Sequence, residues 1–76
     1  MTDADSRVTK RSVVIAGHAT SVSLEQGFWN VLKDIARERA TSINALIAEI
    51  DETREGNLSS ALRVFVLAEL LKRTPD

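Results

Sequence analysis

Residues 20–50 read TSVSLEQGFWNVLKDIARERATSINALIAEI and combine a strand pattern with two helix patterns. At the start, Val22 and Leu24 alternate with Ser21 and Ser23, which is the period of a strand with one apolar and one polar face. The period then changes to that of an amphipathic helix, whose apolar stripe consists of Phe28, Val31, Leu32, Ile35 and Ala36. A short strand therefore leads directly into a helix.

A second helix follows after an interruption at residues 40–42. Thr41 or Ser42 is expected to cap it, because a hydroxyl oxygen at this position accepts a backbone N–H of the first turn. Its apolar stripe consists of Ile43, Leu46, Ile47 and Ile50. The predicted order is strand, helix, turn and helix.

The residues before this segment predict a further strand. Val13, Val14 and Ile15 form a β-branched run that suits a strand covered on both faces. Gly17 then permits a turn or a bulge, so the chain either folds back as a hairpin or continues as one bent strand. Without a break, Val13 and Ile15 would share the outer face with the serines of the next strand, an unfavourable mixture. We therefore expect a break near Gly17.

The spacing of these residues resembles the ribbon-helix-helix fold of the Arc repressor, the methionine repressor and the CopG-type transcription factors. The resemblance covers about residues 18–50, with a strand ending at Leu24 and Ser42-Ile43-Asn44 opening the second helix. The strings RSVVIAGHATSVSLEQGFW and LSSALRVFVL are also similar to a subgroup of small bacterial members. The resemblance implies a mainly α fold with a short N-terminal β segment. It further implies a homodimer, in which one strand from each chain pairs antiparallel into an intermolecular ribbon.

A third helix is predicted over Leu58–Arg73, with Asn57 or Ser59 as its cap. Its residues are apolar almost all the way round, and a 76-residue monomer has too little protein to surround such a helix. This pattern favours a dimer or a larger assembly such as a tetramer.

The expected organisation is a flexible N-terminal arm over residues 1–10, a ribbon-helix-helix core over residues 11–55, and a helix over residues 56–74 that completes the dimer core.

The resemblance implies that the polar face of the ribbon meets base edges in the major groove of DNA. The expected DNA-binding residues are Lys10, Arg11, His18, Ala19, Ser21 and Ser23. A DNA phosphate is expected at the start of the second helix, where free N–H groups favour an anion, beside Thr41, Ser42 and Asn44. The expected core and dimer-interface residues are Val22, Leu24, Phe28, Trp29, Leu32, Leu46, Ile47, Leu62 and Phe65.

The charge of the chain bears on how it could bind DNA. Ten Lys and Arg residues against eleven Asp and Glu residues give a formal net charge of −1. This balance disfavours a protein that coats DNA indiscriminately, because such binding depends on clustered positive charge. Arg7, Lys10 and Arg11 nevertheless flank the candidate ribbon, so the charge balance leaves room for a DNA-facing edge that is locally positive.

Other function classes find little support in the sequence. Cysteine is absent and His18 is the only histidine, so we expect no metal site, no cofactor and no enzyme activity. No apolar run reaches the ~20 residues of a membrane span, and the first residues lack the core of a signal peptide.

The leading hypothesis is a cytoplasmic, nucleoid-associated homodimer that represses transcription by binding double-stranded DNA. The alternative is an interaction module, such as an antitoxin whose C-terminal helix binds a partner protein.

Overall fold

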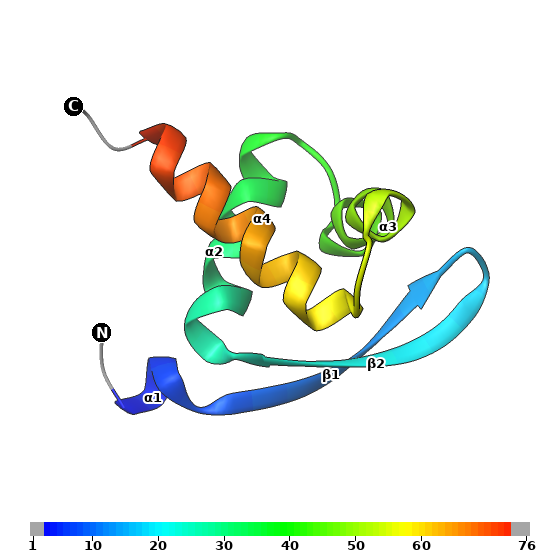
Figure 1. Cartoon of the computed structure of the whole chain (residues 1–76), viewed down its shortest axis with the longest axis horizontal. Helices are drawn as coiled ribbons and strands as arrows, with labels where there is room; N and C mark the ends of the chain where they lie inside the picture. Colours follow the sequence, from blue (N-terminus) through cyan, green and yellow to red (C-terminus); the bar gives the residue numbers. More distant parts are fainter. Residues whose placement is uncertain (1–2, 74–76) are drawn as a thin grey trace.

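A β-ribbon carries helices on one of its faces in the computed structural model, which describes residues 3–73 (Figure 1). The elements are α1 (Asp3–Ser6), β1 (Val8–Ile15), β2 (His18–Glu25), α2 (Gln26–Glu38), α3 (Ile43–Thr53) and α4 (Leu58–Arg73). Within the described residues, β1 and β2 form the antiparallel ribbon, and α2, α3 and α4 pack above it. The expected fold class is confirmed, since a mainly helical chain begins with a short β segment and ends with an added helix.

The ribbon is a hairpin formed within one chain. Its register runs from Val8 opposite Glu25 to Ile15 opposite His18. The connecting residues Ala16 and Gly17 have φ angles of 52° and 83°. Two successive positive φ values match the right-handed twist of the flanking strands, which is why short hairpin turns use them. The break expected near Gly17 is confirmed, and the chain folds back there rather than continuing as one bent strand.

This pairing differs from the intermolecular ribbon that the family resemblance implies. Every residue of β2 pairs with β1 of the same chain. The physical reason is the short turn, which returns the chain alongside itself and needs no second molecule to satisfy the inner edge of β2. In a two-stranded sheet each strand still keeps one unpaired edge. Pairing with a second chain across such an edge stays a prediction.

The hydrophobic core lies between the ribbon and the helices. The turn places Val13 on the same face as Val22 and Leu24, and all three are buried. Among the described residues, the buried apolar side chains are those of Val13, Val22, Leu24, Trp29, Leu32, Ile35, Ala36, Leu46, Ile47, Ile50, Leu62 and Val66. Of the residues expected in the core, Phe28 and Phe65 are only partly buried.

The predicted helix boundaries and caps agree well with the structure. The Oγ of Ser42 accepts the N–H of Ala45 at 3.0 Å, and the Oδ1 of Asn57 accepts the N–H of Ser60 at 2.8 Å. Each satisfies a donor that helix geometry leaves free. Before α3, Ala40 adopts a φ of 55° and turns the chain out of α2. Ser42 and Asn57 are thereby confirmed as caps.

The N-terminal segment contains regular structure where the sequence predicts a flexible arm. α1 forms one turn and β1 already begins at Val8, so residues 8–10 belong to the ribbon. The N–H of Gln26 donates to the carbonyl oxygen of Arg7 at 2.8 Å, which joins this segment to the start of α2. Residues 1 and 2 of the expected arm, and residue 74 of the expected C-terminal segment, lie outside the described residues.

Replacing Gly17 by alanine is expected to lower the free energy of unfolding by about 1 kcal/mol, because a side chain at its positive φ is strained. Gly56→Ala is the matched control. An added Cβ meets no atom within 4 Å at either glycine, but only Gly17 has a left-handed φ. Urea unfolding followed by Trp29 fluorescence measures both variants. Equal losses of stability would contradict the positive-φ turn.

Candidate nucleic-acid interface

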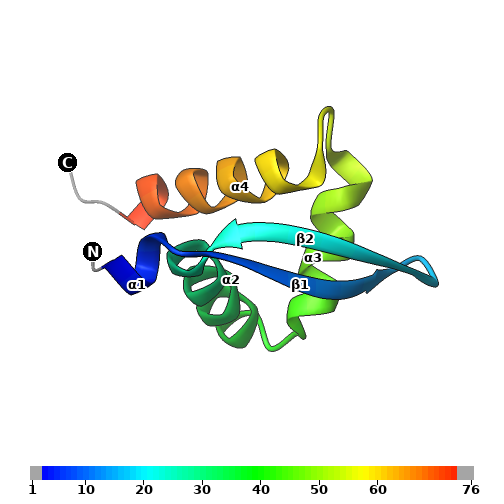
Figure 2. The ribbon, with the colours of Figure 1, turned by 90° about the horizontal axis from the view of Figure 1, so that it is seen from below.

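The face of the ribbon that points away from the helices is exposed, and we call it the outward face (Figure 2). It includes the cross-strand pairs Lys10 with Ser23, Ser12 with Ser21, and Val14 with Ala19. Serine hydroxyls donate and accept hydrogen bonds, and a lysine ammonium donates them. The outward face can therefore contact an extended polar ligand without any change in the core behind it.

The hairpin register brings together part of the predicted DNA-binding set. Lys10, Ala19, Ser21 and Ser23 share the outward face. Ser12 joins them although it is not among the residues predicted from the sequence. Its position follows from the turn, because a loop of Ala16 and Gly17 alone sets Ser12 opposite Ser21. The position of the turn would therefore have been enough to predict that Ser12 lies on the outward face.

Arg11 and His18, also predicted to bind DNA, lie away from the outward face. Arg11 is on the inner face opposite Val22, with its guanidinium carbon 5.5 Å from the centroid of the Trp29 ring. Its Nε is buried and has no hydrogen-bond partner among the described residues. His18 is exposed at the start of β2, beside the turn. The structure therefore separates these two side chains from the serines.

Hydrogen bonds across the inner face fix the ribbon against α2. The Nε1 of the fully buried Trp29 donates to the carbonyl oxygen of Thr9 at 2.9 Å. The Oγ1 of Thr9 donates in turn to the Oε1 of Gln26 at 3.0 Å. A buried indole N–H needs such a partner, and here the partner is backbone of β1. These hydrogen bonds join α2 to β1, the strand that bears Lys10 and Ser12 on its outward face.

The predicted phosphate-binding residues form a separate group beside the ribbon. Figure 2 shows α3 crossing behind the strands, with its N-terminal end on the β1 side. The Ser42 hydroxyl is occupied by its capping bond to Ala45. The N–H groups of Ile43 and Asn44 have no intrahelical acceptor, as at any helix start. Thr41 is half-buried and Asn44 exposed, and binding of a phosphate here stays a prediction.

An ion pair closes the end of the ribbon where β2 meets α2. The Nε of Arg63 on α4 donates to Glu25 at 3.0 Å. The backbone N–H of Glu25 and the Arg63 guanidinium both lower the pKa of the Glu25 carboxyl. The negative charge of Glu25 is therefore compensated, while Lys10 makes no ion pair with any described residue. Sequence patterns could not reveal Arg63, because it lies 38 positions from Glu25.

Residues 3–73 offer neither a metal-binding cluster nor a membrane-spanning helix. No group of three or more His, Cys, Asp or Glu side chains in that range is arranged to hold a metal ion. None of its helices is both long enough and apolar enough to cross a membrane.

The order of ribbon and helices is shared with known proteins. A family model described as a ribbon-helix-helix domain matches residues 8–70. The chain belongs to the ribbon-helix-helix family. Members of this family are generally DNA-binding transcription regulators or antitoxins, not enzymes.

The structure of this ribbon-helix-helix chain is similar to that of an uncharacterized protein from Bordetella pertussis Tohama I, with a TM-score of 0.85. The two chains are 32% identical in sequence. The similarity covers 96% of this chain and 63% of that chain, so the present chain spans under two thirds of its structural neighbour. No curated protein matches it.

The lowered pKa of Glu25 predicts a pH-dependent contribution to the stability of this ribbon-helix-helix chain. A carboxyl with a lowered pKa binds its proton less tightly in the folded chain, so its stabilising effect is present at neutral pH. The effect is lost as the pH falls below the ordinary value of 4.5. Glu25→Gln should therefore unfold more easily than the wild type at pH 7, and the difference should shrink in acid.

Thermal unfolding of both proteins across this pH range, followed by circular dichroism, measures the effect. Glu52→Gln, at an exposed position of α3, controls for the removal of one acidic group. A difference between wild type and Glu25→Gln that does not change with pH would contradict the prediction.

Proposed function

We propose that this chain is a transcriptional regulator, acting as a homodimeric repressor, that places the outward face of its ribbon in the major groove of DNA. It would act in the cytoplasm, at the nucleoid. The observation that carries the proposal is the exposed set of serines and Lys10 on the outward face of a ribbon-helix-helix chain. These side chains point away from the core and are exposed, so another molecule can reach them.

The dimensions of the ribbon suit this role. Two strands lie about 4.8 Å apart, and with their side chains they match a major groove about 12 Å wide. The hairpin supplies both strands from one chain, so each copy carries a complete groove-sized element. A dimer would therefore present two ribbons.

The outward side chains suggest how DNA would be read. The hydroxyls of Ser12, Ser21 and Ser23 can pair with several bases, and Val14 and Ala19 can contact the methyl group of thymine. Hydroxyls discriminate between bases less sharply than the bidentate side chains of Arg or Asn. We therefore expect a moderate sequence preference, with much of the affinity coming from the phosphate backbone.

Phosphate contacts would come from Lys10 and from the start of α3. The free N–H groups of Ile43 and Asn44 and the positive end of the helix dipole favour an anion. Thr41 and Asn44 would add side-chain donors beside them. Contacts of this kind fix the position of the ribbon on the duplex without reading its sequence.

Lys10→Ala is expected to weaken DNA binding and to reduce the salt dependence of log Kd by about 0.9, the effect of one lost phosphate contact. Lys33→Ala, which removes an exposed lysine on α2, is the matched control and should bind like the wild type. Fluorescence anisotropy with DNA fragments selected from a genomic pool measures both across a salt series.

Replacing Ser12, Ser21 and Ser23 together by alanine tests the reading of bases. This variant should keep its salt dependence and lose the preference for selected over random DNA, since each neutral hydrogen bond contributes about 1 kcal/mol. Wild-type protein that binds no genomic fragment at low salt would contradict the proposed function.

A second candidate is an interaction module that binds another protein, as an antitoxin does. The observation that favours it is a row of exposed apolar residues on α4, where Val64 is 64% and Leu71 64% accessible. Affinity capture followed by mass spectrometry would support this candidate if a foreign protein is recovered at a fixed ratio to the wild type. Recovery of the chain alone would count against it.

A further inference from the structure

Arg11 is a charged residue on the face of the ribbon that packs against the helices. The register sets it opposite Val22 and two residues before Val13, and both valines are buried. The side chain of Arg11 is half-buried, and its Nε is buried without a hydrogen-bond partner. A guanidinium carries five N–H donors. Those of Arg11 form no hydrogen bond or ion pair with any residue of 3–73, so its charge and its donors are left without an acceptor there.

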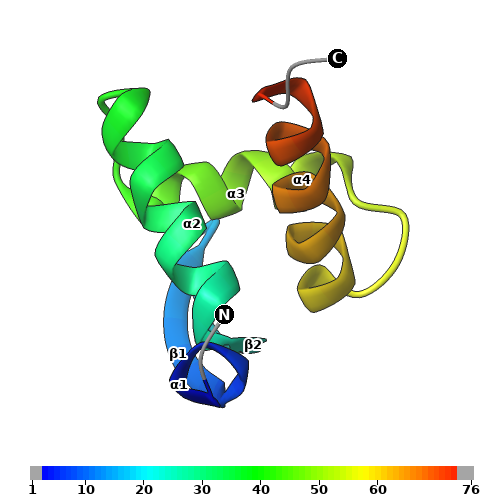
Figure 3. The ribbon, with the colours of Figure 1, turned by 90° about the vertical axis from the view of Figure 1, so that its left-hand side faces the viewer.

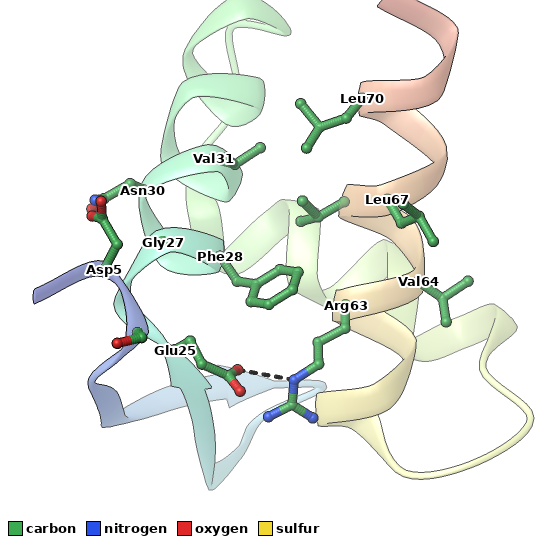
Figure 4. Close-up of a pocket in the computed structure, with 12 residues that line it drawn as sticks. Asp5, Glu25, Gly27, Phe28, Asn30, Val31, Arg63, Val64, Leu67 and Leu70 are labelled. Carbon is green, nitrogen blue, oxygen red and sulfur yellow. Dashed lines mark hydrogen bonds and ion pairs between the residues drawn. The ribbon is translucent and has the colours of Figure 1, made fainter. Parts of the chain in front are cut away.

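The carboxylates of the surrounding elements are engaged elsewhere or lie elsewhere. Glu25, the acidic residue of the two strands, faces Arg63 of α4 (Figure 4). The acidic residues of α2 and α4 form ion pairs as well: Asp34 with Arg37, Glu38 with Arg73, and Glu69 with Arg39. Those of α3 lie in its second half, and Figure 3 shows α3 running from the β1 side of the ribbon towards α4. Among the described residues, no carboxylate pairs with Arg11.

The ring of Trp29 stabilises the position of the Arg11 guanidinium. The guanidinium carbon lies 5.5 Å from the centroid of the ring, within the range of a cation–π contact. The ring itself is fixed, because Trp29 is fully buried and donates its N–H to the carbonyl oxygen of Thr9. A guanidinium that stacks on a ring keeps its N–H groups in its own plane, where they can still bind. The ring therefore orients Arg11 and leaves its terminal N–H groups unused.

Packing alone does not account for an arginine at this position. The methylene groups of Arg11 can cover apolar surface, but an uncharged methionine would cover it equally well. A half-buried charge without a partner lowers the stability of the fold. Departures of this kind are expected where a residue serves function rather than folding. The charge of Arg11 therefore indicates an anion that comes from outside the described residues.

We propose that Arg11 binds a phosphate of the DNA backbone at the wall of the major groove, on the β1 side of the ribbon. This inference rests on the proposed function and adds to it a phosphate contact from the inner face. Arg11 would be a positioning residue, because a phosphate contact sets the register of the ribbon on the duplex without reading bases.

The place of Arg11 in the ribbon suits a backbone phosphate. With the outward face towards the base edges, the unpaired edges of the two strands face the two walls of a groove about 12 Å wide. Arg11 is on β1, and the start of α3, where a phosphate is also proposed, lies on the same side (Figures 2 and 3). The planar fork of an arginine matches two phosphate oxygens, and its weak hydration suits a half-buried site.

Fluorescence anisotropy with a random-sequence DNA duplex across a salt series tests the contact. Arg11→Met should weaken binding by roughly tenfold or more and should reduce the salt dependence of log Kd by about 0.9. Arg11→Lys keeps the charge, so it should keep the salt dependence and lose only part of the affinity. Arg37→Met is the matched control, since the side chain of Arg37 is 78% exposed on α2 and pairs with Asp34. It should bind like the wild type.

Neutral methylphosphonate linkages, placed one at a time in a selected genomic fragment, locate the phosphate. One linkage should weaken binding of the wild type and cause no further loss in Arg11→Met, because the contact is already absent from that variant. Losses that add at every linkage would overturn the proposal.

Urea unfolding, followed by the fluorescence of Trp29, separates a binding role from a structural one. Arg11→Met should be at least as stable as the wild type, since it removes an uncompensated charge and keeps an apolar side chain beside the ring. A less stable Arg11→Met that binds DNA with unchanged salt dependence would show that Arg11 serves the fold and would overturn the proposal.

The remaining outcomes distinguish the source of the phosphate from the failure of the proposed function. Inorganic phosphate, exchanged for chloride at equal ionic strength, is the probe for a free anion. If it changes the fluorescence of Trp29 in the wild type but not in Arg11→Met, and both bind DNA equally, the site takes free phosphate and the DNA contact is overturned. A wild type that binds no DNA removes the proposed function and this contact with it. A wild type that binds DNA no better than Arg11→Met removes only the contact.

Discussion

The two positive φ angles at Ala16 and Gly17 fix the arrangement on which the rest of this structure depends. A turn of these residues sets the register of the hairpin, and the register decides which side chains face the helices. Val13 is thereby turned towards Val22 and the core, while Ser12 and Ser21 meet on the opposite face. A shift of one residue would bury the serines and expose the valines, so the core and the candidate DNA-binding face depend on the same turn.

The ribbon and the helices form one unit because α2 begins at the residue after β2. Leu24 is buried in the core one residue before the end of β2, and Trp29 lies one turn into α2, where its N–H donates to the backbone of β1. The indole thus joins the first strand to a helix that follows the second strand. These contacts tie the ribbon to α2. A surface that is already formed in the free chain favours recognition, since it does not have to be ordered when it binds.

Most local structure of this chain could be predicted from its sequence, whereas its long-range contacts could not. Periodicity and capping chemistry give the helix over Leu58–Arg73, the cap at Ser42 and the break near Gly17, because each depends on neighbouring residues. The pairing of β1 with β2 depends on the geometry of the turn. The positive φ of Ala16 is part of that geometry, and the identity of the residue does not predict it. The ion pairs of Glu25 with Arg63 and of Arg39 with Glu69 join residues 38 and 30 positions apart. The charge of Arg11 predicts a contact with DNA, whereas the register of the hairpin sets Arg11 on the inner face, near the ring of Trp29.

A hairpin within one chain changes what a second copy would contribute. Where a ribbon is shared between chains, a monomer has no element to place in the groove. Here each copy already has a complete ribbon, so a dimer would contribute by linking two ribbons. One ribbon with a single lysine and a few hydroxyls would make few contacts to DNA, whereas two ribbons linked in a dimer would bind the second site at a high effective concentration.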